Sequence, residues 1–88
     1  MEKDAKMTSE EILEELSYVN EQAILIDGMD DALVGIDMVD YVAVYDVNKC
    51  VEILMITSEM TRKEAQEYFE YNILSAYVGD YTPRFVQF

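Results

Sequence analysis

The sequence predicts a small α+β domain, in which an antiparallel sheet of three or four strands packs against two or three helices. Hydrophobic residues form 51% of the 88-residue chain, which provides enough apolar surface for a folded core. Apolar residues recur at helical spacing in three segments, whereas the pattern between Ala23 and Asp46 is that of extended chain. A chain this short has room for one core, so residues 1–88 are expected to form a single domain.

The first helix is predicted from about Ser9 to Val19. Thr8 and Glu11 have the T-x-x-E spacing of a capping box, in which each side chain binds the other residue's backbone amide. Apolar residues then recur along one side, and glutamates cover the remaining surface: Ile12, Leu13, Leu16 and Val19 against Glu10, Glu11, Glu14 and Glu15. The helix is expected to end near Asn20.

Three apolar runs predict the strands of an antiparallel meander: residues 23–26, 32–36 and 41–45. Residues 27–31 and 37–40 separate these runs and have the composition of turns. A short helix over residues 30–36 is the alternative, because the apolar residues of that segment also fit about one helical turn.

Two more helices and a final strand are predicted in the second half of the chain. Asp46 is placed to cap a helix that ends near Ile56. A second T-x-x-E box at residues 61–64 begins another helix, and Gly79 supplies its left-handed end. The apolar side of this helix is expected to contain Ala65, Tyr68, Phe69, Ile73, Ala76 and Tyr77. After Pro83, residues 84–88 have the pattern of an edge strand with Phe85 packed inward.

Charge is the most pronounced feature of the composition. Nineteen acidic residues against six basic ones give a formal net charge of −13. Such a field repels nucleic acid and anionic membranes, and it speeds the encounter with basic partners. The alternative is that the acidic residues serve only to keep the protein in solution.

The chain is expected to be cytoplasmic, in a bacterial host cell. No apolar run approaches the roughly 18 to 20 residues of a membrane span, and the first residues do not resemble a secretory signal. The single cysteine, Cys50, cannot form an intramolecular disulfide, which suits a reducing compartment.

Residue usage argues against an enzyme. The sequence contains no histidine, so the Ser-His and Cys-His pairs of nucleophilic catalysis cannot form, and the usual zinc ligand sets are excluded. Cys50 lies on the apolar side of its helix and is expected to be buried and inert. The three glycines are isolated and form no phosphate-binding loop. We therefore expect no cofactor and no catalytic residue.

Two segments are candidates for binding. Asp27, Asp30 and Asp31 surround a glycine turn where carboxylates can meet a cation, although the EF-hand spacing is not met and no metal site is expected. Tyr45 or Glu67 is the expected partner of this turn in a ligand site. Tyrosines on an acidic surface, together with the methionines Met29 and Met38, have the composition of a protein-binding patch. Its anchors are expected at two segments: Glu70, Tyr71 and Asn72, and Asp80 with Tyr81.

From Ala23 onward the chain resembles a group of short uncharacterised proteins of bacteriophages and bacteria. The residues that carry the resemblance are 27–32, Gly35, 42–46, Lys49 with Cys50, 60–72, 76–79, and Thr82 with Pro83. The resemblance implies a phage origin and brings no activity with it. If the proteins of this group share a site, the resemblance implies that the site uses the matching polar residues: Asp27, Asp30, Asp31, Tyr45, Asp46, Glu67 and Asn72. Two of these residues also have a structural explanation. Asp46 can cap a helix, and Asn72 can fix the geometry of its helix.

These observations predict a small, non-catalytic, acidic binding protein that engages a basic surface of a host protein. A nucleic-acid-binding protein would suit this role, because carboxylates on a compact body can replace phosphates in its groove and so inhibit it. The alternative is a small-molecule or cation binder that uses the turn at residues 27–31. A homodimer through the C-terminal strand stays open, since Phe85 and Phe88 favour pairing and the net charge opposes it.

Overall fold

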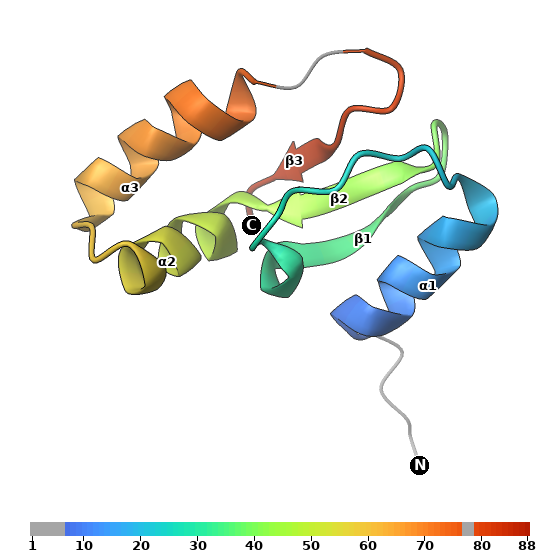
Figure 1. Cartoon of the computed structure of the whole chain (residues 1–88), viewed down its shortest axis with the longest axis horizontal. Coiled ribbons are helices and arrows are strands. Elements are labelled where there is room, and N and C mark those ends of the chain that lie inside the picture. Colours follow the sequence, from blue (N-terminus) through green and yellow to red (C-terminus); the bar gives the residue numbers. More distant parts are fainter. Residues whose placement is uncertain (1–6, 77–78) are drawn as a thin grey trace.

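The computed structural model describes residues 7–76 and 79–88, and its core lies between a central sheet and the helices on either side of it (Figure 1). The molecule is flat, with extents of 37 × 37 × 19 Å. Along the chain the elements are α1 (Ser9–Val19), the 3₁₀ turn η1 (Asp30–Ala32), β1 (Leu33–Asp37), β2 (Val42–Asp46), α2 (Val47–Thr57), α3 (Arg62–Phe69), the π turn η2 (Glu70–Leu74) and β3 (Arg84–Val86). The predicted α+β class is confirmed.

Both predicted capping boxes are present, and they fix where α1 and α3 begin. The Thr8 hydroxyl accepts from the amide of Glu11 at 3.2 Å, and the Glu11 carboxylate accepts from the amide of Thr8 at 2.8 Å. Thr61 and Glu64 form the same pair of bonds at 3.1 and 2.9 Å. Each box satisfies two backbone donors that the helix itself leaves without partners. The predicted bounds of α1 are confirmed.

The sheet is mixed, so the predicted antiparallel meander is wrong. β1 and β2 form an antiparallel hairpin with an irregularity between Leu33 and Gly35. β3 then pairs with the other edge of β2 in parallel, which gives the order β1-β2-β3. The C-terminal strand therefore extends the sheet beyond β2, whereas the edge of β1 where residues 23–26 would pair in a meander has no strand beside it among the described residues.

Residues 23–26 were expected to form a strand, and that prediction is wrong. The amide of Ile24 donates to the carbonyl of Tyr81 at 3.0 Å, and the amide of Ile26 donates to the hydroxyl of Tyr45 at 3.0 Å. The segment thus satisfies these two amides with a loop and a side chain instead of a strand ladder. The alternative helix over residues 30–36 is limited to the single turn η1, after which β1 begins.

The helix predicted after Thr61 changes its geometry partway along. α3 ends at Phe69, and the π turn η2 carries the chain through Leu74. The hydroxyl of Ser75 donates to the carbonyl of Glu70 at 2.8 Å, which satisfies a backbone acceptor of this turn. Gly79 has a φ of +105°, a left-handed conformation that favours glycine, but the helical stretch ends at Leu74, so the prediction that Gly79 ends this helix is wrong. Tyr77, which the sequence placed on the apolar side of this helix, lies outside the described residues.

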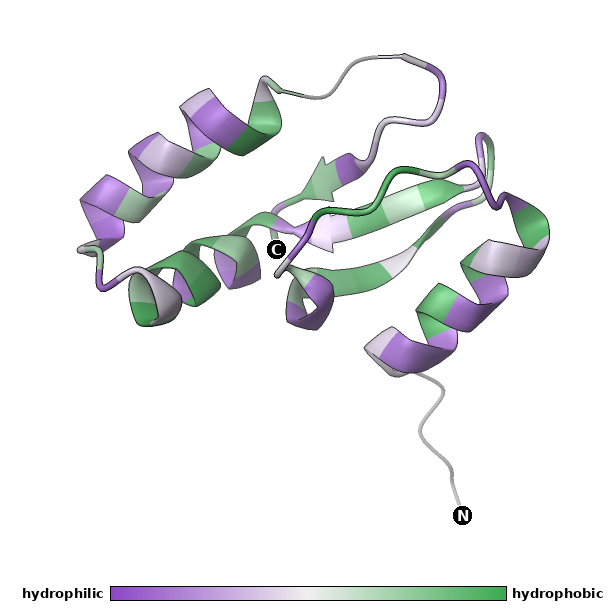
Figure 2. Ribbon diagram, viewed as in Figure 1, coloured by the Kyte–Doolittle hydropathy of each residue, from purple (hydrophilic) through white to green (hydrophobic). Residues whose placement is uncertain are grey.

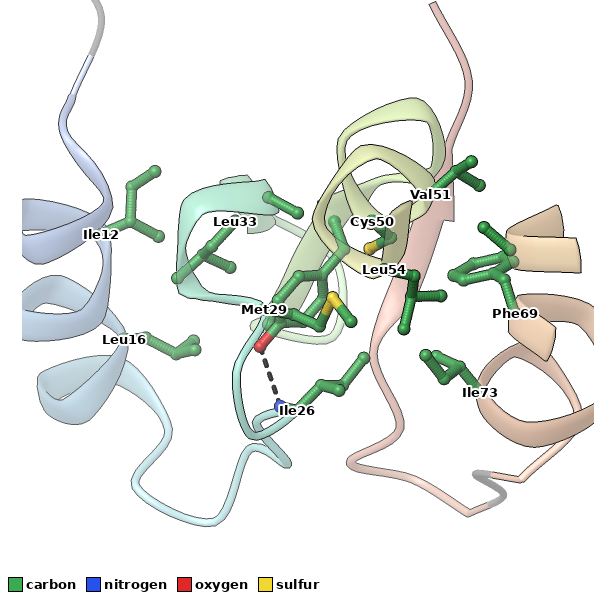
Figure 3. Close-up of a cluster of buried hydrophobic side chains, with 14 residues drawn as sticks. Ile12, Leu16, Ile26, Met29, Leu33, Cys50, Val51, Leu54, Phe69 and Ile73 are labelled. Carbon is green, nitrogen blue, oxygen red and sulfur yellow. Dashed lines mark hydrogen bonds between the residues drawn. The ribbon is translucent and has the colours of Figure 1, made fainter. Parts of the chain in front are cut away.

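The core joins all of these elements (Figure 3). Tyr45, on the central strand, is fully buried. Its ring lies 6.1 Å from that of Phe85 in β3, and Phe85 meets Phe69 of α3 edge to face at 5.3 Å. The expectation that Phe85 packs inward is confirmed. The remaining buried members come from the helices, from β1 and β2, and from the chain before β1: Ile12, Leu16, Ile26, Met29, Ala32, Leu33, Ala43, Cys50, Val51, Leu54, Ala65 and Ile73.

Replacing Tyr45 with phenylalanine should destabilise the fold by about 1 to 3 kcal/mol, because the buried amide of Ile26 loses its acceptor while the ring is kept. Urea unfolding followed by circular dichroism measures this difference. Tyr18→Phe is the matched control, since Tyr18 is exposed, and it should change the stability by less than about 0.5 kcal/mol. Equal stabilities of the two variants would contradict the role given to the Tyr45 hydroxyl.

Candidate functional site

Most of the acidic side chains are displayed at the surface. Within residues 7–76 and 79–88, every aspartate and glutamate is exposed except Asp37 and Asp46. The basic residues of the same ranges are Lys49, Arg62, Lys63 and Arg84. The negative charge is therefore carried on the exterior, where it can act on a partner at a distance.

Helix α1 has one strongly anionic side. Ile12 and Leu16 are buried on its opposite side, which holds the helix in a fixed orientation. The exposed positions include four glutamates, and the helix contains no basic residue: Glu10, Glu11, Glu14 and Glu15. Figure 2 shows hydrophilic and apolar residues alternating along this helix. We call these four residues the α1 acidic face.

The turn between β1 and β2 is organised by Asp37. Its Oδ1 accepts from the amides of Val39 at 2.8 Å and Asp40 at 3.1 Å, and its Oδ2 lies 3.4 Å from Nε of Arg84. Arg84 also pairs with Asp40. The backbone hydrogen bonds from Asp40 and Val39, assisted by Arg84, lower the pKa of Asp37. Of the two methionines expected in a surface patch, Met38 is 72% exposed on this turn and Met29 is buried.

The lowered pKa of Asp37 predicts a loss of stability in acid. Because the folded state holds this carboxylate ionised, its contribution is complete above the unfolded pKa of about 3.9 and is lost as the pH falls through the lower folded value. Asp37→Asn should therefore melt at a lower temperature than the wild type near neutral pH, with the gap narrowing in acid. Thermal melts across this pH range measure the gap, and a gap that does not depend on pH would refute the prediction.

The aspartates of the predicted turn are all exposed and do not form a metal site. Asp27 precedes Gly28, whose φ is +82°, while Asp30 and Asp31 form the start of η1. Among the described residues, no group of three or more acidic or cysteine side chains is arranged to hold a metal ion. The three carboxylates are close in sequence, but Asp27 and Asp31 line different grooves.

The other predicted binding residues fall in different environments. Tyr45 lies in the core, and Glu67 is exposed on α3. Glu70, Tyr71 and Asn72 lie on the π turn η2, where the Tyr71 side chain is 79% exposed. Asp80 and Tyr81 are exposed in the loop before β3. π turns occur often at functional sites, so the presence of η2 favours a functional role for this segment.

One groove brings two of the predicted residues together. It lies between the chain at 25–29, α2 and the end of α3 with η2, has a volume of about 460 Å³ and is open to solvent. Asp27 lines one side and Asn72 another. We call it the Asp27 groove, and its lining is Leu25, Ile26, Asp27, Gly28, Met29, Ile53, Leu54, Thr57, Tyr68, Asn72 and Ile73.

The polar groups of the Asp27 groove favour a ligand that donates hydrogen bonds. The Thr57 hydroxyl donates to the carbonyl of Ile53 at 2.8 Å, and Nδ2 of Asn72 donates to the carbonyl of Tyr68 at 3.2 Å. These bonds use the Thr57 hydroxyl proton and one N–H of Asn72, and the Asp27 carboxylate and the Asn72 amide oxygen stay available as acceptors, beside the second Asn72 N–H and the Tyr68 hydroxyl. The lining of this groove, among the described residues, contains no basic side chain.

Tyr68 is the groove residue that sequence reasoning missed. Its position at helical spacing from Ala65 and Phe69 indicated a core residue, yet its side chain is 42% exposed. The segment at 25–29, predicted as a strand and a turn, supplies the opposite wall. No local pattern indicated that these two segments meet.

A second groove, of about 580 Å³, has mixed charge. It lies between the N-terminal ends of α1 and α2, and Lys49, Asp31 and Asp46 all line it. Asp46 is buried and acts as the cap of α2, with Oδ1 accepting from the amides of Asn48 at 2.9 Å and Lys49 at 3.4 Å. The predicted capping role of Asp46 is confirmed.

Cys50 is fully buried on α2, as predicted. Burial raises the pKa of its thiol to about 12, and the nearby Asp46 adds to this effect. The thiolate is the nucleophilic form, so the folded protein keeps this cysteine unreactive at neutral pH.

No protein-family model, curated protein or solved structure matches the chain. Within the ranges 7–76 and 79–88, none of the helices has the length and apolar character needed to cross a bilayer. The surface features that bear on function are the α1 acidic face and the Asp27 groove.

Proposed function

We propose that this protein is a small acidic binding protein of phage origin, without catalytic activity, that engages a basic surface of a host protein. The observation that carries the proposal is the exposure of nearly all described acidic side chains on a body with few basic ones. The described ion pairs are those of Arg84 with Asp37 and Asp40, so most of the described carboxylates have no cation beside them. A basic partner would supply those cations.

The fixed orientation of α1 supports specific binding. Glu10, Glu14 and Glu15 project from a helix whose apolar side is locked into the core, so their spacing is maintained without a partner. Charges that are already ordered lose less entropy on association than charges on a mobile segment. A partner that normally binds nucleic acid fits this proposal, because its basic groove attracts a compact array of carboxylates. In that case the protein would act as an inhibitor that mimics nucleic acid, in the cytoplasm of the bacterial host.

A second candidate function is the binding of a small molecule. The observation in its favour is the Asp27 groove, whose volume of about 460 Å³ lies within the roughly 300 to 1,000 Å³ of ligand pockets. A ligand that binds only the folded state must raise the melting temperature. A metabolite panel screened by thermal denaturation tests this candidate, and a panel without such a rise would leave the protein-binding proposal favoured.

Association with a protein partner should slow steeply with salt. The partner would be captured from a bacterial lysate on the immobilised protein and identified by mass spectrometry. The association rate of the purified pair would then be measured between about 50 and 200 mM salt. The triple variant Glu10→Gln, Glu14→Gln, Glu15→Gln should lower this rate at low salt, because it removes steering charge while the buried side of α1 is unchanged.

The matched control carries the same change of charge on the other helices and the loop between them: Glu52→Gln, Glu59→Gln and Glu67→Gln. If α1 is the contact face, the control should lower the rate less than the α1 variant. Rates that do not change with salt or with either variant would refute the proposal, and the acidic residues would then serve solubility alone.

A further inference from the structure

We propose that the Asp27 groove holds the side chain of one arginine or lysine of the partner protein. This inference rests on the proposed function for the class of partner and assigns a defined point of contact to it. Three properties of the groove carry it: apolar walls, acceptors at the surface, and a lining without positive charge.

The walls suit the aliphatic part of a long basic side chain. Ile26, Leu54 and Ile73 come from three different segments and point toward one another in Figure 3. Arginine and lysine bury their methylene groups against apolar surface while the charged end stays hydrated. An open groove with an apolar floor permits this arrangement, whereas a closed apolar cavity would strip the charge of water.

The acceptors are placed for the charged end. Asp27 is exposed, so its carboxylate can pair with a cation that keeps part of its hydration. The half-exposed ring of Tyr68 lines the same groove and can contact the cation by its face. The amide oxygen of Asn72 offers a further acceptor, which suits the several N–H donors of a guanidinium.

The π turn explains why these groups share one groove. A π turn connects residue i with residue i+5, whereas an α-helix connects i with i+4. Tyr68, Asn72 and Ile73 all line the groove, and they span the junction between α3 and η2. If the α-helix continued past Phe69, the residues after it would be rotated relative to Tyr68. Asn72 and Ile73 would then no longer face the same groove together.

Other occupants fit less well. A hard cation such as Ca²⁺ needs about six to eight oxygen ligands, and Asp27 is the one carboxylate among the described lining residues. An anion would be repelled by Asp27 and by the net charge of −13. The second groove contains Lys49, which opposes a basic side chain there.

The test uses the full chain labelled with ¹⁵N and two capped tripeptides, acetyl-Ala-Arg-Ala-amide and its citrulline counterpart, which has nearly the same shape without the charge. The arginine peptide should shift amide signals of residues 25–29, 53–57 and 68–73 in a saturable manner. The citrulline peptide should bind about tenfold more weakly, because it loses the charge-assisted bond to Asp27. Shifts spread evenly over the acidic surface would overturn the proposal.

Asp27→Asn should remove the preference for arginine over citrulline, since it deletes the carboxylate and keeps a residue that tolerates turns. Glu21→Gln is the matched control, because it makes the same change of charge at an exposed residue that does not line the groove. It should leave the preference unchanged. A preference that survives Asp27→Asn would refute the assignment.

Two further measurements distinguish this inference from its alternatives. Agmatine, a free guanidinium compound, should bind more weakly than the peptide, whereas agmatine binding without peptide binding would overturn the inference in favour of a small-molecule site. If partner association depends on salt and on the α1 acidic face but not on Asp27, the groove assignment fails while the proposed function stands.

Discussion

The hydrogen bond between the Ile26 amide and the Tyr45 hydroxyl connects the sheet to the chain that forms one wall of the groove. Tyr45 lies on β2, which is the only described strand with a neighbour on both sides. Its ring contacts Phe85, and Phe85 contacts Phe69. A single buried tyrosine therefore links the segment before η1 and the C-terminal strand to the central strand. The position of Asp27 depends on this bond, because Asp27 directly follows Ile26.

The acidic residues divide into those that stabilise the fold and those that do not take part in it. Four carboxylates bind backbone amides: Glu11 and Glu64 in the capping boxes, Asp37 in the hairpin turn and Asp46 at the start of α2. These hydrogen bonds give the four residues a role in folding that requires no partner protein. Glu10, Glu14, Glu15 and Asp27 have no comparable structural role. The case for binding depends on these unexplained carboxylates, because the total charge counts both kinds.

Local signals predicted the parts of the fold that depend on neighbouring residues. The two capping boxes and the Asp46 cap lie within three residues of the amides they bind, so the starts of α1, α2 and α3 could be inferred from sequence. The apolar run at 23–26 was assigned to a strand because its composition is that of a strand. Its actual position depends on hydrogen bonds to Tyr45 and Tyr81. Both residues are distant in the sequence, so no local pattern could indicate these bonds.

Individual residues of the candidate site could be predicted from sequence, but their arrangement could not. Asp27 and Asn72 were named individually, but the groove that joins them needs two segments that are far apart in the sequence, residues 25–29 and 68–73. Tyr68 was assigned to the core because regular helical spacing was assumed through the whole segment. Tyr68 lies on α3, before the π turn, and its exposure depends on how α3 packs against the rest of the fold. Sequence reasoning therefore found the polar groups and missed the surface that gathers them.

The parallel pairing of β3 with β2 affects the order in which the chain can fold. Two helices intervene between these strands, so one edge of β2 has no strand beside it until the last part of the chain arrives. During synthesis on the ribosome, the hairpin and α2 emerge first and expose that edge together with the ring of Tyr45. Contacts between distant residues form slowly, and an open strand edge invites pairing with other chains. The dense negative charge then gives the nascent chain a second benefit, since mutual repulsion keeps incomplete copies apart.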